Sequence, residues 1–250
     1  MKALILEEIT TSELKKYIEN IKIAVVPTGS CEQHGPNTTF ATDTVRAYEI
    51  AKLLGVKYGK DLLICPPLGY GISPHHMNFT GTITLRIETF VSVMMDIAWS
   101  LKEHGIKKIL FLTGHGGNRH ALSTVITKIK MEYNIDAYWA GTGSGLVKDL
   151  LDKKGCSEIR GHACEAETSQ SLYLAPWLVK DDKLEKGKLI KDNKYIYKEI
   201  VRDGGVFWDF SSITENGALG DATKSSIELG KEITDLVIDR LSDMIDKIIL

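Results

Sequence analysis

The segment KILFLTGHGGN, residues 108–118, joins an almost continuous apolar run to three glycines that surround His115. An apolar run without polar alternation is typical of a strand whose sheet is covered by helices on both faces. The glycines allow the backbone to turn tightly and to approach another group closely. The segment therefore predicts a buried strand of a parallel sheet, with a polar loop at its carboxyl end.

Similar apolar runs alternate with longer amphipathic stretches along the chain. This alternation predicts a three-layer α/β/α protein with a mostly parallel central sheet. The sequence has no internal repeat and no Gly/Ser/Pro-rich linker, so residues 1–250 are expected to form a single domain. The Lys- and Asp-rich segment 181–203 is expected to be a loop. The expected strands are Ile21–Val26, Leu62–Cys65, Lys108–Thr113 and Asp136–Ala140. The expected helices are Thr11–Ile18, Thr44–Leu54, Ile87–His104, His120–Tyr133, Glu165–Leu174 and Ser225–Ile249.

The composition excludes several classes of partner. The chain carries 31 Lys and Arg against 33 Asp and Glu, a net charge of −2, and has no basic stripe, so no nucleic-acid partner is expected. No apolar run approaches the roughly 20 residues of a membrane span, so no membrane association is expected either. The N-terminus lacks the pattern of a signal peptide, and the four cysteines have no CxxC spacing. We therefore expect a cytoplasmic protein without disulfides.

A first polar cluster follows the strand that ends near Val26. Glu32 and His34 alternate by two residues, so their side chains share one face of an extended segment. Asp43 lies at the start of a predicted helix and could return to the same point. Glutamate, histidine and aspartate suit Zn²⁺, Mn²⁺ or Fe²⁺. The alternative is that Asp43 caps the helix and His34 is an ordinary loop histidine.

A second and a third cluster also lie at the ends of predicted elements. His115 is followed by Gly116, Gly117 and Asn118, where free N–H groups at a helix start would favour an anion; the alternative is a tight turn. In the third cluster, His162 and Glu165 would share a helical face, whereas Glu167 would point elsewhere. Carboxylates that complement the helix dipole would explain both glutamates, but they do not explain the histidine.

A fourth cluster places adjacent histidines on a loop rich in glycine and proline, residues 69–82. His75 and His76 are expected at a substrate rim, or simply at the surface, and neither is expected to bind metal. Five of the seven histidines thus lie in four glycine-rich polar segments. This concentration favours a hydrolase site with one or two metal ions over independent structural roles.

Other catalytic motifs are incomplete. The segment Gly141–Gly145 resembles a dinucleotide-binding loop, but GxGxxG needs a glycine where Leu146 stands. The chain has no GxSxG nucleophile elbow and no GxxxxGK[ST] loop. Cys31 and Cys164 lie beside candidate site residues, where cysteine is more often a small packing residue than a nucleophile.

The polar segments together resemble the creatininase (creatinine amidohydrolase) family. The resemblance rests on residues 29–36 with Thr42 and Asp43, on 76–82, on 114–118 and on 162–169, in the family's order. It implies a creatininase-like layered fold and a hydrolase with two divalent metal ions. Zn²⁺ is the expected ion, with Mn²⁺ or Fe²⁺ as alternatives. It also suggests a homo-oligomer, often a hexamer.

Carried over by position, the resemblance implies that Glu32 and His34 each bind one metal, that Asp43 bridges both and that His115 is a further ligand. Creatininase itself has a glutamate two residues after that histidine, where this chain has Gly117. We expect Glu165 to supply the missing carboxylate, and His162 matches a histidine implicated in proton transfer. The residues expected to bind substrate or to support the ligands are His76, Gly116, Gly117, Asn118 and Glu167.

The resemblance does not fix one substrate. Gly117 disfavours creatinine itself, so we expect a small cyclic amide or a formamide, attacked at its carbonyl by a metal-activated water. Other branches of the family process modified peptides or open cyclic ketones made from inositols, and the ketone reaction is the main alternative. A metal- or small-molecule-binding protein without catalytic activity is the alternative from a different class.

Overall fold

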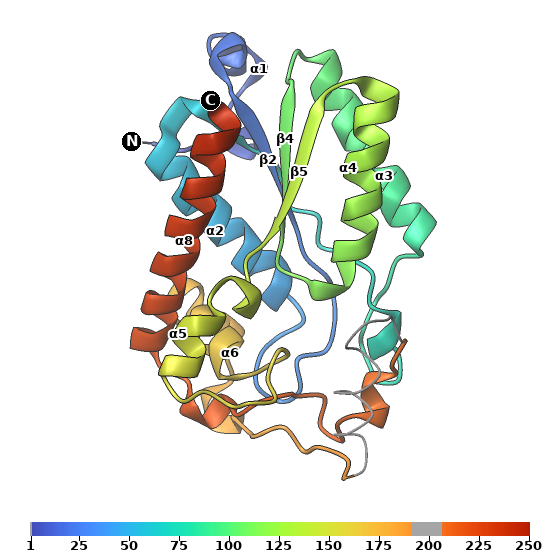
Figure 1. Ribbon diagram of the computed structural model, residues 1–250, viewed down its shortest axis with the longest axis vertical. Helices are drawn as coiled ribbons and strands as arrows, with labels where there is room; N and C mark the ends of the chain where they lie inside the picture. Colours follow the sequence, from blue (N-terminus) through green and yellow to red (C-terminus); the bar gives the residue numbers. More distant parts are fainter. Residues whose placement is uncertain (1, 192–206) are drawn as a thin grey trace.

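The computed structural model describes residues 2–191 and 207–250, and its centre is a five-stranded parallel sheet (Figure 1). The order of the strands is β1-β3-β2-β4-β5, and every neighbouring pair is parallel. The α/β fold with a largely parallel sheet is therefore confirmed. The strands are β1 (Leu4–Ile5), β2 (Ile23–Thr28), β3 (Leu62–Ile64), β4 (Lys108–Thr113) and β5 (Asp136–Gly141).

Helices cover both faces of the sheet, which explains why its strands are apolar without alternation. Successive residues of β2 alternate between two cores: Ile23 and Val25 belong to one, Ala24 and Val26 to the other. The first core is closed by α2 (Thr42–Tyr58), α6 (Glu165–Leu174) and α8 (Ile227–Ile249). The second is closed by α3 (Ile87–Glu103) and α4 (Arg119–Tyr133), on the opposite side in Figure 1.

Several short elements differ from the expectation. The expected helix Thr11–Ile18 is only one turn, α1 (Thr11–Leu14), which a capping box between Thr10 and Glu13 starts. The strand β1 and the helix α5 (Lys148–Lys153) were not predicted, because two and six residues are too few to display a period. Of the expected loop 181–203, residues 192–203 lie outside the described part of the chain.

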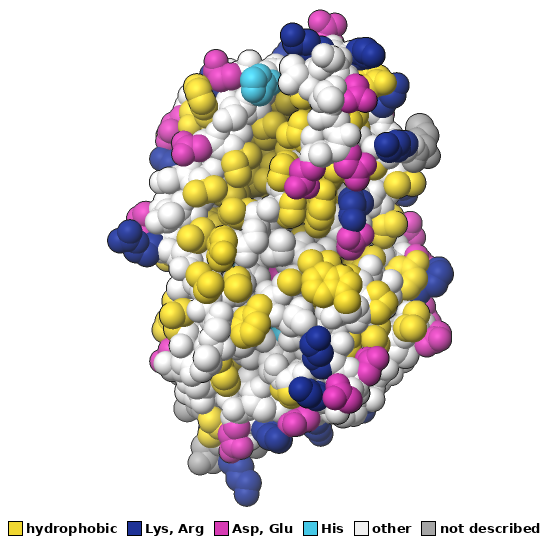
Figure 2. All heavy atoms as spheres, turned by 180° about the vertical axis from the view of Figure 1, so that it is seen from behind, with side chains coloured by type: hydrophobic (Ala, Val, Ile, Leu, Met, Phe, Trp, Pro, Cys, Tyr) yellow, Lys and Arg dark blue, Asp and Glu magenta, His cyan; other side chains and the backbone are white. Residues whose placement is uncertain are grey.

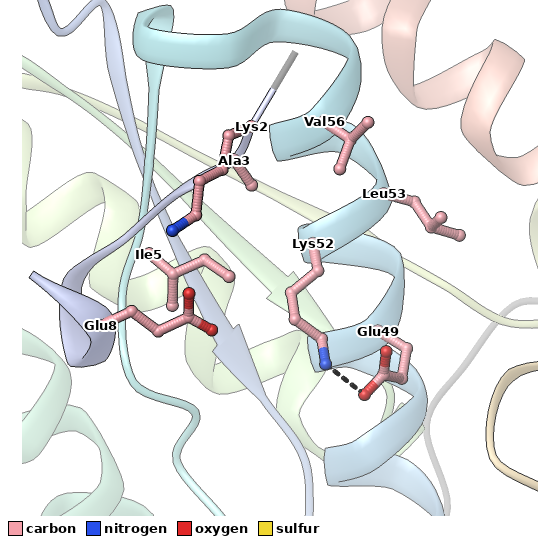
Figure 3. Close-up of a pocket in the computed structure, with 8 residues that line it drawn as sticks. All are labelled: Lys2, Ala3, Ile5, Glu8, Glu49, Lys52, Leu53 and Val56. Carbon is pink, nitrogen blue, oxygen red and sulfur yellow. Dashed lines mark hydrogen bonds and ion pairs between the residues drawn. The ribbon is translucent and has the colours of Figure 1, made fainter.

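A shallow hollow lies beside β1, far along α2 from the helix's first turn (Figure 3). It has a volume of about 330 Å³, and two of its lining residues on α2, Lys52 and Glu49, form an ion pair of 2.5 Å. Since α2 begins at the carboxyl ends of the strands, this hollow lies away from the polar clusters. Its lining residues are Lys2, Ala3, Ile5, Glu8, Glu49, Lys52, Leu53 and Val56.

The polar clusters gather at the carboxyl ends of β2 and β4, in the lower half of Figure 1. The register pairs Thr28 with Thr113, so both strands end at the same level. Ligand sites of open α/β sheets lie at this edge. Among the described helices, none is both long and apolar enough to cross a membrane.

The helices α6 and α8 pack closely, although α6 is polar almost throughout. Its buried residues include Thr168, Ser169, Gln170 and Ser171. Gly230 of α8 makes the approach possible, because an added Cβ there would lie 1.9 Å from the carbonyl oxygen of Ser169. The amide of Ser226 donates a hydrogen bond of 3.1 Å to Ser169 Oγ at the start of α8.

Gly230→Ala is expected to lower the free energy of unfolding by about 1–3 kcal/mol, the usual cost of overpacking. The reason is that a backbone carbonyl, which cannot rotate away, occupies the space for the new methyl group. Chemical denaturation measures the change. Gly145→Ala is the matched control, since the nearest atom to its added Cβ is a side-chain nitrogen 3.8 Å away. Equal stability of the two variants would contradict this close packing of α6 on α8.

Candidate metal centre

Four of the expected metal-binding side chains meet at the sheet edge. Glu32 and His34 follow β2, Asp43 is in the first turn of α2, and His115 follows β4. Each is buried, with at most 4% of its surface exposed. Their convergence from three separate elements is what the carboxyl edge of a parallel sheet provides.

Asp43 lies at the middle of this cluster. Its Oδ1 is 3.3 Å from His34 Nε2, and its Oδ2 is 3.1 Å from His115 Nδ1. The same His115 nitrogen is 3.2 Å from Glu32 Oε1. One carboxylate that faces two histidines through two different oxygens has the arrangement of a bridging ligand.

Hydrogen bonds on the far side of each ring orient both histidines. His34 Nδ1 donates to the carbonyl of Glu32 at 3.2 Å, and His115 Nε2 donates to the carbonyl of Ile72 at 2.9 Å. A neutral imidazole with one nitrogen protonated presents a lone pair on the other. His34 Nε2 and His115 Nδ1 therefore face the cluster and would offer it a lone pair once each ring is neutral, as in metal sites with supporting hydrogen bonds.

Two polar atoms in the cluster lack a hydrogen-bond partner among the described residues. They are His34 Nε2 and Asp43 Oδ2, both buried. Buried polar groups are nearly always paired, so an unpaired nitrogen and an unpaired oxygen in one cluster need another partner. A divalent cation fits this donor set of imidazole nitrogens and carboxylate oxygens. Glu32, His34 and Asp43 offer ligand atoms within 4.8 Å of one another.

Glu167 joins the cluster and Glu165 does not. Glu167 Oε2 lies 3.9 Å from His34 Nε2, and Glu167 forms a possible ligand group with His34 and His162. Glu165 turns to the other side of α6, where its carboxylate accepts hydrogen bonds from the amides of Ser157 and Asp221. The two glutamates are two residues apart on a helix, so only one of them can face the sheet edge. The geometry favours Glu167 as the carboxylate ligand, in contrast to the expectation from the sequence.

A buried arginine holds Glu167 in place. Arg46 is 1% exposed, and its Nη1 donates to Glu167 Oε1 at 2.8 Å. Its Nε and Nη2 both donate to Gln170 Oε1, at 3.0 and 2.8 Å. Glu167 Oε2 accepts from the amide of Ala163 at 2.7 Å, and that residue adopts a left-handed φ of 50°. A non-glycine residue in this region is uncommon and is often found where a site requires it.

His162 lies against the cluster, and one of its ring nitrogens is engaged in a hydrogen bond to the backbone. Its Nε2 donates to the carbonyl of Gln33 at 2.7 Å, which leaves Nδ1 facing Glu32 Oε1 at 3.6 Å. Its ring packs between those of His34 and His76, at centroid distances of 4.3 and 4.4 Å. A neutral ring in this orientation presents a proton-accepting lone pair to the metal cluster.

The other expected residues support the loops around the site. His76 Nδ1 accepts from Gln33 Nε2 at 2.8 Å. Asn118 bonds the amide of Ile72 and the carbonyl of Gly29, both at 3.0 Å, and so ties the loops together. Gly117 is enclosed, because an added Cβ would lie 2.3 Å from the Ile72 carbonyl oxygen, whereas an added Cβ on Gly116 would meet nothing within 4 Å.

The charges of the cluster shift several pKa values. Burial alone would raise the pKa of Glu32, but the charge and hydrogen bond of His115, together with the charges of His76 and His162, hold that pKa well below its usual range. Burial would lower the pKa of His34, but Asp43 raises it to about 9. The pKa of His115 is raised well above its usual range, since Glu32 and Asp43 overcome the effect of burial. Burial lowers the pKa of His162, and the neighbouring His34 adds to this shift.

The buried Cys164 is not suited to act as a catalytic nucleophile at this site. Burial raises the pKa of Cys164 to about 12, and the charge of Glu167 adds to the effect. The thiolate is the reactive form, so a thiol with a raised pKa is a poor nucleophile. All four cysteines are free.

Comparison with known proteins agrees with this geometry. A family model described as "Creatininase: Creatinine amidohydrolase" matches residues 7–245. The chain belongs to the creatininase family. It is a metal-dependent hydrolase of that family, and its histidine and carboxylate groups suit a binuclear metal site.

Two relatives within this family carry different names. The mycofactocin precursor peptide peptidase of Mycolicibacterium smegmatis (strain ATCC 700084 / mc(2)155) is 28% identical over 246 residues, which cover 95% of this chain and 90% of the relative. The 3-dehydro-scyllo-inosose hydrolase of Thermotoga maritima (strain ATCC 43589 / DSM 3109 / JCM 10099 / NBRC 100826 / MSB8) is 25% identical over 264 residues, covering 96% and 81%. The family is therefore shown, and the substrate is not.

Solved structures show the same fold. A putative creatinine amidohydrolase from Bacteroides fragilis NCTC 9343 superposes with a TM-score of 0.84 at 23% identity, covering 100% of this chain and 97% of that one. A creatininase mutant described as of the Zn-Zn type superposes with a TM-score of 0.80 at 21% identity, covering 99% and 98%. These likenesses confirm the creatininase-like architecture.

Several residues at the site were not predicted from the sequence. Ser73 Oγ donates to Glu32 Oε2 at 2.5 Å, and the ring of Phe210 lies 4.3 Å from that of His76. Arg46 was also missed, whereas His75 was expected at a substrate rim or at the surface. Serine, arginine and phenylalanine are too common to stand out, whereas the Pro74-His75-His76 loop does give a signal, although the sequence alone indicates no more than a substrate rim.

Substitution of the two glutamates of α6 should separate their roles. Glu167→Gln is expected to lose one equivalent of metal, because its carboxylate faces His34. Glu165→Gln is expected to keep the metal and to lose stability instead, because its carboxylate holds two backbone amides. Metal analysis after dialysis, with thermal denaturation, checks both variants. Loss of metal only in Glu165→Gln would reverse the assignment.

Metal binding at neutral pH is expected to release about two protons, because metal ligands must be deprotonated. With the pKa of His34 raised to about 9 and that of His115 well above its usual value, both rings are protonated when no metal is bound. The apparent affinity should therefore rise as the pH increases from neutral to about 9, where His34 loses its proton unaided. Titration calorimetry in buffers of different ionisation enthalpy counts the protons. Binding without proton release would show that the two rings are neutral before the metal arrives.

Proposed function

We propose that this protein is a two-metal amidohydrolase that cleaves a small cyclic amide or a formamide. The observation that carries the proposal is the buried Asp43 carboxylate, whose two oxygens face two different histidines while His34 Nε2 and Asp43 Oδ2 have no hydrogen-bond partner among the described residues. Mixed imidazole and carboxylate ligands suit Zn²⁺ and also accept Mn²⁺ or Fe²⁺. The Zn-Zn type of a creatininase with the same fold supports zinc.

The side chains divide into two ligand sets that share one carboxylate. Glu32 and His115 form one set, His34 and Glu167 form the other, and Asp43 belongs to both. Two divalent ions so held supply a nucleophilic hydroxide near neutral pH and polarise a carbonyl oxygen. The hydrogen bonds from Ser73 to Glu32 Oε2 and from Arg46 to Glu167 Oε1 orient each carboxylate, so that Glu32 Oε1 and Glu167 Oε2 face the cluster, although Glu167 Oε2 also accepts from the amide of Ala163.

His162 handles the proton. Its Nε2–H donates to the Gln33 carbonyl. Nδ1, which faces the ligand cluster, is therefore the nitrogen that can accept and release a proton. The lowered pKa keeps the ring neutral, and it can accept a proton from the attacking water and pass it to the leaving nitrogen. Amide cleavage needs this second transfer, because an amine anion is a very poor leaving group.

The ring-opening of an inositol-derived cyclic ketone is the second candidate. It begins with the same addition of hydroxide to a carbonyl, but the proton from His162 would go to carbon. The similarity to the 3-dehydro-scyllo-inosose hydrolase along 96% of this chain favours it. The similarity to a peptidase, whose name specifies amide cleavage, favours the amide reaction. A metal-binding protein without catalysis would leave the orientation of His162 unexplained.

A homo-oligomer, with the hexamer suggested by the family resemblance, is also part of this proposal. Large apolar side chains are exposed on the described surface, and Figure 2 shows hydrophobic side chains gathered over the middle of one face with charges around its edge. Contiguous apolar patches of this kind often mark protein interfaces. Exposed apolar residues include Tyr70, Met77, Ile83, Ile87, Trp99 and Trp177.

A substrate panel with two variants tests the proposed reaction. The purified enzyme is assayed with cyclic amides, formamides and cyclic ketones, each with Zn²⁺, Mn²⁺ and Fe²⁺. We expect turnover of an amide, retained metal but a loss of turnover of about 10²–10⁴-fold in His162→Ala, and loss of metal in Asp43→Ala. His120→Ala, at an exposed position on α4, is the control and should match the wild type.

Each contrary outcome has a distinct meaning. Turnover of ketones alone would replace the amide reaction by the second candidate. Tight retention of a small molecule without any turnover would indicate a binding protein. Full metal content and full activity in Asp43→Ala would exclude its bridging role.

A further inference from the structure

One histidine beside the ligand cluster has no role in the proposed reaction. His75 lies on the 3-10 turn Pro74–His76, and its ring is parallel to that of His115 within 8°, at a centroid distance of 5.8 Å. We propose that His75 is a further ligand of the metal held by Glu32 and His115. This inference rests on the proposed two-metal site and adds a residue to it.

The geometry supplies the first argument. Glu32, His75 and His115 each offer a ligand atom, and these atoms lie within 4.8 Å of one another. Three donors within this limit can reach one cation after side-chain rotations that bring them closer, because zinc–ligand bonds of about 2.0–2.2 Å in a tetrahedral site place ligand atoms roughly 3.3–3.6 Å apart. Glu32 and His115 are buried, and His75 is half-buried at the rim, so the loop can adjust there.

The hydrogen bonds of the three neighbouring histidines supply the second argument. His76 Nδ1 is held by Gln33, His115 Nε2 by the Ile72 carbonyl and His162 Nε2 by the Gln33 carbonyl. Within residues 2–191 and 207–250, no hydrogen bond or ion pair involves the ring of His75. Among the described residues, its ring lies near those of His76, His115 and Phe210. Its ring is held by packing, and neither ring nitrogen has a hydrogen-bond partner among the described residues. Such a histidine is suited to coordinate a metal ion.

Gly117 supplies the third argument, because it determines where another ligand can come from. An added Cβ at this position would lie 2.4 Å from His115 Nε2, 2.3 Å from the Ile72 carbonyl and 3.0 Å from His75 Cε1. Position 117 can therefore hold no side chain beside the Nε2 edge of the His115 ring. His75 lies on the far side of this same space and approaches His115 from another loop.

A metal bound by Glu32, Asp43, His115 and His75 would have two nitrogen and two oxygen ligands. The other ion, bound by His34, Asp43 and Glu167, would have one nitrogen, and Arg46 Nη1 lies 3.9 Å from Asp43 Oδ1 on that side. The two sites should thus differ in affinity, and removal of His75 should weaken only the stronger one.

The test compares metal binding by His75→Ala, by His120→Ala as the control and by the wild type. Each protein is stripped with a chelator and titrated with Zn²⁺ against a competing chromophoric chelator, and Co²⁺-loaded samples are examined by absorption and paramagnetic proton NMR. We expect His75→Ala to bind one of two ions more weakly by at least the roughly 10–100-fold typical of lost supporting groups. One exchangeable imidazole N–H resonance of the cobalt protein should also disappear, and His120→Ala should retain both properties.

The outcomes separate this inference from the proposal on which it rests. If the wild type binds two ions and His75→Ala has the same affinities and the same imidazole resonances, His75 is no ligand and the two-metal site stands. If that variant loses activity with unchanged metal binding, His75 contacts substrate and the inference is likewise overturned. If the wild type binds no metal, the proposed function itself fails. Equal thermal denaturation of the stripped proteins establishes that the variant is folded.

Discussion

The first turn of α2 lies directly against the carboxyl ends of β2 and β4, and the rest of the site depends on this contact. A Cβ on Gly29 would lie 2.4 Å from the amide of Thr44, and one on Gly114 would lie 2.1 Å from the carbonyl oxygen of Asp43. Because these two glycines at the strand ends have no side chains, α2 can pack close enough for the Asp43 carboxylate to reach both His34 and His115. Any larger residue at either glycine would lift the helix and separate the carboxylate from the two rings.

This close approach buries more charge than a core normally tolerates. Glu32, Asp43 and Glu167 bring three carboxylates together, and Arg46 compensates only one of them. The raised pKa values of His34 and His115 show how the remaining charge is balanced without metal, since both imidazoles hold protons. Divalent ions bound here would replace these protons, so metal binding would be coupled to pH.

The sequence predicted much of the scaffold, because a strand covered on both faces leaves a clear apolar run. It also predicted the convergence of Glu32, His34, Asp43 and His115, since parallel strands end at one edge. It predicted that the glycines around His115 allow a close approach, but not that Gly114 approaches the backbone of α2. The choice between Glu165 and Glu167 was equally inaccessible, because it depends on the rotation of α6 against α8. That rotation is set by contacts such as Gly230 against Ser169, more than fifty residues apart in the sequence.

The side chains that border the site come in part from a different segment than the proposed metal ligands. The ligands lie at strand ends and on α2 and α6, whereas Phe210 and Gly217 reach the site from the segment before α8. Gly217 accepts a hydrogen bond from Gln33 through its carbonyl, and the bridge between His162 and Leu219 continues the contact. Addition of hydroxide to a carbonyl needs only the ligand scaffold, whatever the leaving group is. The segment around Phe210 thus borders the site without contributing any of the proposed metal ligands.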